Sequence, residues 1–187
     1  MPIKIHIPKQ EIFDEEQNIF LNTKCDYDLI LEHSLISISK WESKWHKPYL
    51  KDETKTTEQA FDYIRCMTVS PSDVEESVYK LIPQSELKKI TDYINDSMTA
   101  TKVPKTKNSK VSKPEILTSE LMYYYMFEAG IPKDCEKWHI NRLLTLITVY
   151  GFKREQADPN KKVSRSELIA RNKRINEQNR RRFHTKG

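Results

Sequence analysis

Glycine is the residue whose scarcity most constrains this chain, because 187 residues contain only Gly130, Gly151 and Gly187. Loops that cradle a phosphate need several glycines, since the backbone must approach the ligand closely. The chain therefore has neither a P-loop nor a dinucleotide-binding fingerprint. It also has no GxSxG or HExxH motif, and no two of its five histidines are four residues apart. These absences argue against nucleotide-binding, serine-hydrolase and zinc-protease functions, and we predict no cofactor and no metal.

The cysteines and the apolar runs indicate the compartment. Cys25, Cys66 and Cys135 are far apart, and none belongs to a CxxC motif. An odd, scattered set favours free thiols in a reducing cytoplasm. No apolar run approaches the roughly 18 residues of a membrane helix, and the N-terminal MPIKIHIPKQ lacks the apolar core of a signal peptide. We therefore expect a cytoplasmic protein without a membrane segment.

The local signals predict an α+β fold that is mainly α-helical. Three short stretches rich in β-formers, residues 3–7, 18–21 and 27–33, predict a small antiparallel sheet or hairpin near the N-terminus. An S-x-x-E capping box at Ser39 and Glu42 then predicts a short helix.

Further helices are predicted along the middle of the chain. One covers residues 56–69, another begins at Ser70-Pro71 as an N-cap followed by Pro, and a third lies around residues 87–94. The apolar spacing in the first predicts a buried stripe made of Ala60, Phe61, Ile64 and Met67.

Two more helices are predicted in the second half, each closed by a glycine. The first, residues 118–129, ends at Gly130, and the second, residues 135–150, ends at Gly151. The second is apolar nearly all round, so it is predicted to be the central helix and to pack on the first as an antiparallel hairpin. Its Arg142 then needs a buried partner, which we expect to be a carboxylate such as Glu120 or Glu128.

Charge and composition divide the chain. Residues 1–151 are predicted to form one domain with a flexible loop at 99–114, where there are five lysines, two prolines and no acid. Residues 152–187 form a basic arm with twelve Lys or Arg against four Asp or Glu. A capping box at Ser164 and Glu167 lets a helix start there, although its apolar residues are few.

The candidate catalytic residues are weak. Cys135 and His139 are four residues apart, which suits a nucleophile and base on one helix face, but no third residue is recognisable as the group that orients the base. We favour the interpretation that His139 and Trp138 are packing residues, and we predict no catalytic residue and no enzyme activity.

The candidate partner-binding residues are aromatic or basic. Trp41 and Trp45 share one helix face, and one member of the run at 123–125 must be exposed, for which we name Tyr124. Packing in the core is the alternative for each. In the arm, the candidates are Arg174, Arg180, Arg181, Arg182 and Phe183. Phosphates of nucleic acid are one possible ligand for these residues, although we favour an acidic protein surface; a solvated terminus without a ligand is the remaining interpretation.

Several stretches together resemble a family of small proteins from long-tailed bacteriophages. In chain order they are SLISISKWESKWHKPYL (34–50), FDYIRCM (61–67), SMTATK (97–102), TSELMYYYM (118–126), IPKDCEKWHINRLLTLI (131–147) and SRSELIARNKRINEQNRRRFHTKG (164–187). The family is encoded in the tail-gene region and labelled as tail assembly chaperones. The resemblance runs from about residue 30 to the end and transfers a label rather than catalytic residues.

The resemblance implies a non-enzymatic role in the host cell cytoplasm. A tail assembly chaperone binds the aggregation-prone tape-measure protein while tail-tube subunits polymerise around it. The expected partners are therefore the tape-measure protein or tail-tube subunits, with self-association left open. The alternative is a structural virion component, such as a head–tail connector, a tail protein or a baseplate protein, which would stay in the virion.

Overall fold

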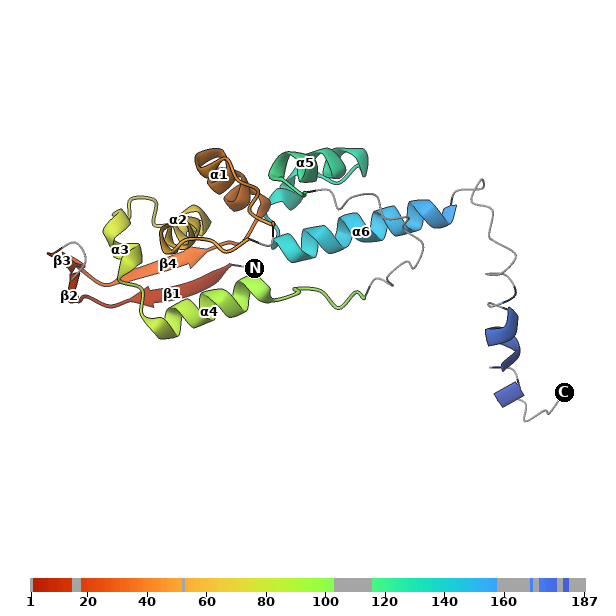
Figure 1. Cartoon of the computed structure of the whole chain (residues 1–187), viewed down its shortest axis with the longest axis horizontal. Coiled ribbons are helices and arrows are strands. Elements are labelled where there is room, and N and C mark those ends of the chain that lie inside the picture. Colours follow the sequence, from red (N-terminus) through yellow and green to blue (C-terminus); the bar gives the residue numbers. More distant parts are fainter. Residues whose placement is uncertain are drawn as a thin grey trace. The chain divides into compact units, whose positions relative to one another are not determined.

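The computed structural model describes residues 2–14, 18–51, 53–102 and 116–157, and in the basic arm residues 169, 172–177 and 180–181. The chain divides into two compact units, residues 1–149 and 150–187. As predicted, the protein is α+β and mainly α-helical, with a small antiparallel sheet near the N-terminus (Figure 1). Most of the predicted loop at 99–114 lies outside the described residues, and so does the predicted capping box at Ser164 and Glu167.

The main sheet contains β1 (Ile3–Ile7), β4 (Tyr27–Leu31) and β5 (Thr68–Ser70), which are antiparallel in the order β1-β4-β5. Side chains of β1 and β4 alternate between core and solvent, as expected for a sheet that is covered on one face. The core-facing residues are Ile5, Ile7, Leu29 and Leu31. On the open face, Asp28 pairs with Lys4 and with His6 at 2.9 Å.

A separate hairpin is formed by β2 (Glu11–Asp14) and β3 (Ile19–Asn22). The predicted strands at 3–7, 18–21 and 27–33 are confirmed within a residue or two. The sequence patterns did not indicate β2, which pairs with β3, or β5, which joins the main sheet from beyond the next two helices.

Helix α1 (Leu35–Trp45) begins five residues earlier than predicted. Its N-cap is Ser34, whose hydroxyl accepts a hydrogen bond from the backbone N–H of Ser37. Glu42 does not complete a capping box, because its carboxylate accepts the backbone N–H groups of Tyr49 and Ser119, each at 2.7 Å. Ser39 and Glu42 therefore lie inside the helix.

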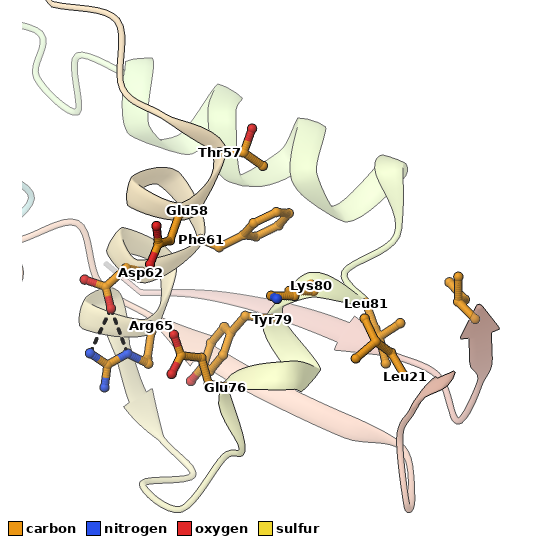
Figure 2. Close-up of a pocket in the computed structure, with 11 residues that line it drawn as sticks. Leu21, Thr57, Glu58, Phe61, Asp62, Arg65, Glu76, Tyr79, Lys80 and Leu81 are labelled. Atoms are coloured by element: carbon orange, nitrogen blue, oxygen red, sulfur yellow. Dashed lines mark hydrogen bonds and ion pairs between the residues drawn. The ribbon is translucent and has the colours of Figure 1, made fainter. Parts of the chain in front are cut away.

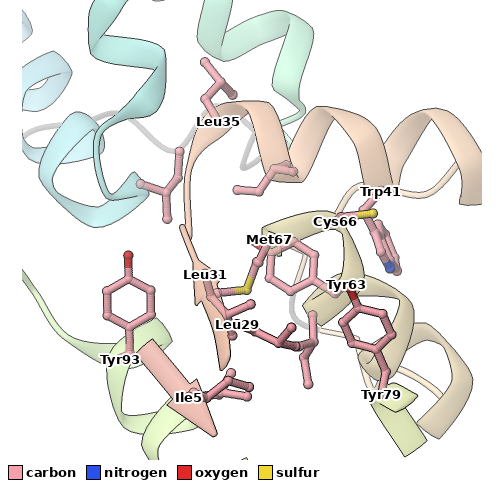
Figure 3. Close-up of a cluster of buried hydrophobic side chains, with 14 of the residues drawn as sticks. Ile5, Leu29, Leu31, Leu35, Trp41, Tyr63, Cys66, Met67, Tyr79 and Tyr93 are labelled. Atoms are coloured by element: carbon pink, nitrogen blue, oxygen red, sulfur yellow. The ribbon is translucent and has the colours of Figure 1, made fainter. Parts of the chain in front are cut away.

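Helix α2 (Thr57–Met67) has its capping box at Thr56 and Gln59. Its predicted apolar stripe is only partly right: Ile64 and Met67 are buried and Phe61 is half-buried, but Ala60 is exposed. The helix packs against both the sheet and α1, so its buried face also includes Asp62, Tyr63 and Cys66. Figure 3 shows Tyr63 and Met67 of α2 among the side chains of the core.

The predicted helix start at Ser70-Pro71 is wrong. Ser70 is the last residue of β5, and helix α3 (Glu76–Lys80) starts further on. Its neighbour α4 (Gln84–Asn95) confirms the helix predicted around residues 87–94. Helix α4 packs against β1 through residues that include the buried Ile90 and Tyr93 (Figure 1).

Helix α5 (Ser119–Glu128) ends as predicted at Gly130, which has a left-handed φ of 64°. A short 3-10 helix η1 (Lys133–Lys137) then leads to α6 (Ile140–Ala157). Gly151 lies inside α6 and does not end it. The predicted antiparallel pairing is also wrong, since α5 packs mainly on α1.

Helix α6 is not the central helix. Among its described residues only Ile140 and Leu143 are buried, and those that follow are half-buried or exposed. Arg142 is exposed, so it needs no buried carboxylate; its guanidinium carbon lies 4.1 Å from the centre of the Trp138 ring. Apolar residues on all sides of this helix predicted that it would be buried, but the neighbouring elements do not fully cover its residues after Leu143.

Candidate partner-binding site

An open groove lies between α2, α3 and the β2–β3 hairpin, and we call it the hairpin groove (Figure 2). Its volume is about 580 Å³. The apolar part of its lining comes from all three elements and the residue after α3, namely Ile12, Leu21, Phe61, Tyr79 and Leu81. Thr57 and five charged side chains complete the described lining: Glu58, Asp62, Arg65, Glu76 and Lys80. The groove therefore combines an apolar surface with charges of both signs.

The register of the hairpin decides which side chains face this groove. Ile12 is opposite Leu21, and Phe13 is opposite Phe20. Successive residues of a strand point to opposite faces, so the Ile12–Leu21 pair faces the groove and the two phenylalanines lie on the other face. Their rings are 4.9 Å apart, and the residues are 44% and 65% exposed. The hairpin is thus apolar on both faces, and both stay partly exposed among the described residues, since Ile12 on the groove face is 47% exposed.

Contacts at its base hold the hairpin in place, since a two-stranded hairpin by itself is marginally stable. The side-chain amide of Gln10 donates to the backbone carbonyl of Leu81, which follows α3. Lys24 pairs with Glu75 at 2.5 Å, and β3 packs against α3. The Ile12–Leu21 side of the groove is therefore fixed relative to α3.

Asp62 is the main polar anchor of the opposite wall. Its buried carboxylate accepts hydrogen bonds from Lys44 at 2.7 Å, from the Trp45 indole at 2.8 Å and from Arg65 at 2.8 Å. Burial alone raises the pKa of a carboxyl, but these hydrogen bonds outweigh it, so the pKa of Asp62 lies below its usual value. The ionised carboxylate ties α1 to α2 and fixes Arg65 at the edge of the groove.

The predicted tryptophan site is a core feature. Trp41 is 1% exposed, and its indole N–H donates to the Gln59 carbonyl at 2.9 Å. A partner cannot reach a side chain at that depth, so Trp41 does not fit the predicted binding role and takes the alternative of packing in the core. Trp45 is half-buried against Asp62, so it has a structural role in α1–α2 packing.

The other predicted residues lie elsewhere. Tyr124 on α5 is 57% exposed and close to Tyr125. Arg174, Arg180 and Arg181 are exposed, while Arg182 and Phe183 lie outside the described residues. The structure thus brings Trp41 and Trp45 together, and neither they nor Tyr124 line the hairpin groove.

Cys135 and His139 do not have the arrangement of a nucleophile and its base. His139 is 3% exposed, and its Nε2–H donates to the Tyr93 carbonyl at 2.9 Å. Its Nδ1 accepts the Asn141 backbone N–H at 3.3 Å. Both ring nitrogens are therefore occupied, and burial lowers the pKa of the imidazole. In this position His139 is a neutral packing residue.

His139 belongs to a set of aromatic rings that we call the junction cluster, all buried except the half-buried Tyr49: His33, Tyr49, Tyr63, Tyr93 and His139. The backbone of His33 accepts the N–H of Ile140, and Ser34 and His139 form a β-bridge, so α1 and α6 both start from this point. Burial, and secondarily the neighbouring His139, lower the pKa of His33 to about 3. The cluster connects α1, α2, α4 and α6 through uncharged side chains.

The described residues contain no group of three or more His, Cys, Asp or Glu side chains placed to hold a metal ion. In the same part of the chain, no helix combines the length and apolar character needed to cross a bilayer. Comparison with known proteins gives no matching family model, curated protein or solved structure.

Proposed function

We propose that this protein is a bacteriophage tail assembly chaperone that binds the tape-measure protein or tail-tube subunits in the host cytoplasm. The observation that carries the proposal is the hairpin groove with the uncovered phenylalanine pair beside it. The resemblance to the phage family supplies the identity of the client.

The groove suits one turn or two of an amphipathic helix from the client. Helix-in-groove recognition uses apolar anchors spaced along one helix face. Ile12, Leu21 and Phe61 offer contacts for such anchors, while Glu58 and Lys80 at the rim offer charges for the polar face. Aromatic side chains contribute strongly to interfaces, so Phe13 and Phe20 add a second contact area on the outer face of the hairpin.

Co-expression tests the proposal. The chain is produced together with the tape-measure protein encoded in the same tail-gene region, and the soluble, co-purified fraction of the client is measured. Ile12→Glu places a charge in the apolar part of the groove, where we expect at least a ~10-fold loss of captured client. Ile30→Glu is the matched control, because Ile30 is 38% exposed against 47% for Ile12 and lies on the open face of the main sheet.

Three results would count against the proposal. If the parent chain does not raise the soluble fraction of the tape-measure protein, the chaperone role is wrong. Equal loss in both variants would mean that the groove is not the contact. Retention of the protein in purified virions at a fixed copy number would favour the structural virion component instead.

A further inference from the structure

A second groove adjoins the first on the other side of Arg65 and Tyr79, which line both. We call it the β5 groove, because Thr68 and Val69 of that strand form one side. Its volume is about 760 Å³. Figure 2 shows Arg65, held by Asp62, and Tyr79 at the boundary with the hairpin groove.

The charge of the β5 groove is its distinguishing property. Its cations come from three separate elements: Lys40 and Lys44 from α1, Arg65 from α2 and Lys137 from η1. Among the described residues that line the groove, Glu32 is the only acid. Asp62 lies behind the wall and its single charge is shared between Lys44 and Arg65. Lys40 and Lys137 form no ion pair with a described residue.

The excess of positive charge is local. Residues 1–151 carry 20 Lys or Arg against 23 Asp or Glu, so the first part of the chain is acidic as a whole. Four cations converging on one groove in an acidic domain produce a positive potential that attracts anions to that place. The exposed Ser72 adds a hydroxyl to the same lining, whereas the hydroxyls of Ser37 and Thr68 already donate to backbone carbonyls.

We infer that the β5 groove binds an acidic, extended segment of a partner protein. β5 is one of the two edge strands of the described sheet, since it pairs with β4 alone. An extended peptide can therefore lie along it, with carboxylates directed to the lysines. The inference shares with the proposed function only the premise that the ligand is a protein. Because the grooves adjoin, one client can fill both.

A nucleic acid fits this groove less well. Proteins that bind single strands use aromatic side chains on which bases stack. In the described part of the lining, Tyr79 is the only aromatic residue; it is 3% exposed and its hydroxyl donates to Thr68 at 3.1 Å. Its ring is not available for stacking.

The test uses a synthetic peptide and not the phage client. A fluorescein-labelled peptide of about twelve residues, alternating Glu and Thr to favour an extended conformation, is titrated with the full chain at low salt, and anisotropy is measured. Lys40→Glu with Lys137→Glu reverses two exposed cations of the groove. Lys9→Glu with Lys88→Glu makes the same change of net charge at exposed positions that line neither groove.

We expect the groove variant to bind the peptide at least ~10-fold more weakly and the control variant within ~2-fold of the parent. Thermal melts should coincide, because all four lysines are exposed. The inference is overturned if the parent chain does not bind the peptide, or if both variants lose peptide binding equally. Tighter binding of an oligothymidine of similar length, lost in the groove variant, assigns the groove to nucleic acid.

The two proposals fail independently. If the peptide does not bind but Ile12→Glu abolishes client capture, only the β5 groove loses its assignment. If the peptide binds as expected and the tape-measure protein is not captured, the acidic-segment site stands and the chaperone role falls.

Discussion

The junction cluster and the β2–β3 hairpin are both built from aromatic pairs at similar spacing, yet they have opposite surroundings. Ring centroids of His33 and His139 are 4.9 Å apart, the same distance as between Phe13 and Phe20. The histidines are 2% and 3% exposed, whereas the phenylalanines are 44% and 65% exposed. Coverage by neighbouring elements separates the two regions, so we expect the first to determine stability and the second to determine binding.

The largest loss of stability should follow from a substitution in the buried region. Trp41 packs edge-to-face on Tyr49 of the junction cluster, with ring centroids 5.2 Å apart. Trp41→Ala removes a fully buried indole and leaves a cavity, so the free energy of unfolding should fall by roughly 3–5 kcal/mol. Urea denaturation followed by circular dichroism measures it. A loss below ~1 kcal/mol would mean that this region is less tightly packed than the structure shows.

Acid should destabilise the same region. His33 has a pKa of about 3 in the folded chain against a usual 6.5, so between these values the unfolded chain binds more protons. Stability from the neutral imidazole is complete above pH 6.5 and is lost as the pH falls toward 3, on the order of 4 kcal/mol in total. Urea titrations at several pH values give the slope.

The matched variants for this pH dependence are two histidine substitutions. His33→Gln should flatten the fall in stability between pH 7 and 4 relative to the parent. His46→Gln changes an exposed histidine at the end of α1 and should leave the slope nearly unchanged. Parallel slopes in the parent and the His33 variant would show that another group is responsible.

An intermediate effect is expected at Trp138, which is half-buried and covered by Arg142 on one side. Trp138→Ala should cost about 1–2 kcal/mol, from partial burial and a cation–π contact. Arg142→Ala should account for a minor part of that loss. A loss of unfolding free energy as large as that of Trp41→Ala would show that Trp138 behaves as a buried residue, which would contradict the distinction between the two regions.

The smallest change in stability should come from the hairpin. Phe13→Ser combined with Phe20→Ser removes side chains that are largely in solvent, so the free energy of unfolding should change by no more than about 1 kcal/mol. Client capture in the co-expression assay should nevertheless fall. If stability drops sharply while capture persists, the hairpin serves the fold and not the partner.

Local patterns were enough for the elements that depend on local physics. The β-formers in residues 3–7 and 27–31 identify two strands, and Gly130 marks a helix end because its φ is positive. β5 could not be found this way: it has three residues, follows α2 directly and exists through its pairing with β4.

The candidate site was missed for a related reason. The predicted partner-binding residues included Trp41, Trp45 and Tyr124 because they are aromatic, but the type of a residue does not reveal whether other elements cover it. The hairpin groove lies between the β2–β3 hairpin and the helices α2 and α3, which are far from the hairpin in sequence. One usable signal was present, since Ile12-Phe13 and Phe20-Leu21 put apolar side chains on both faces of a short hairpin. Likewise, the apolar pattern of α6 could not show that its later turns are only partly covered.

The Glu42 carboxylate joins parts of the chain that are distant in sequence, because it holds both the segment after α1 and the first turn of α5. The β-bridge between Ser34 and His139 makes a second connection across the same gap. Covalent continuity between Lys102 and Ile116 is therefore not what keeps α5 on α1. Residues 1–102 and 116–187, produced as two separate polypeptides, should reassemble by complementation, and new termini could be opened between them in a circularly permuted chain.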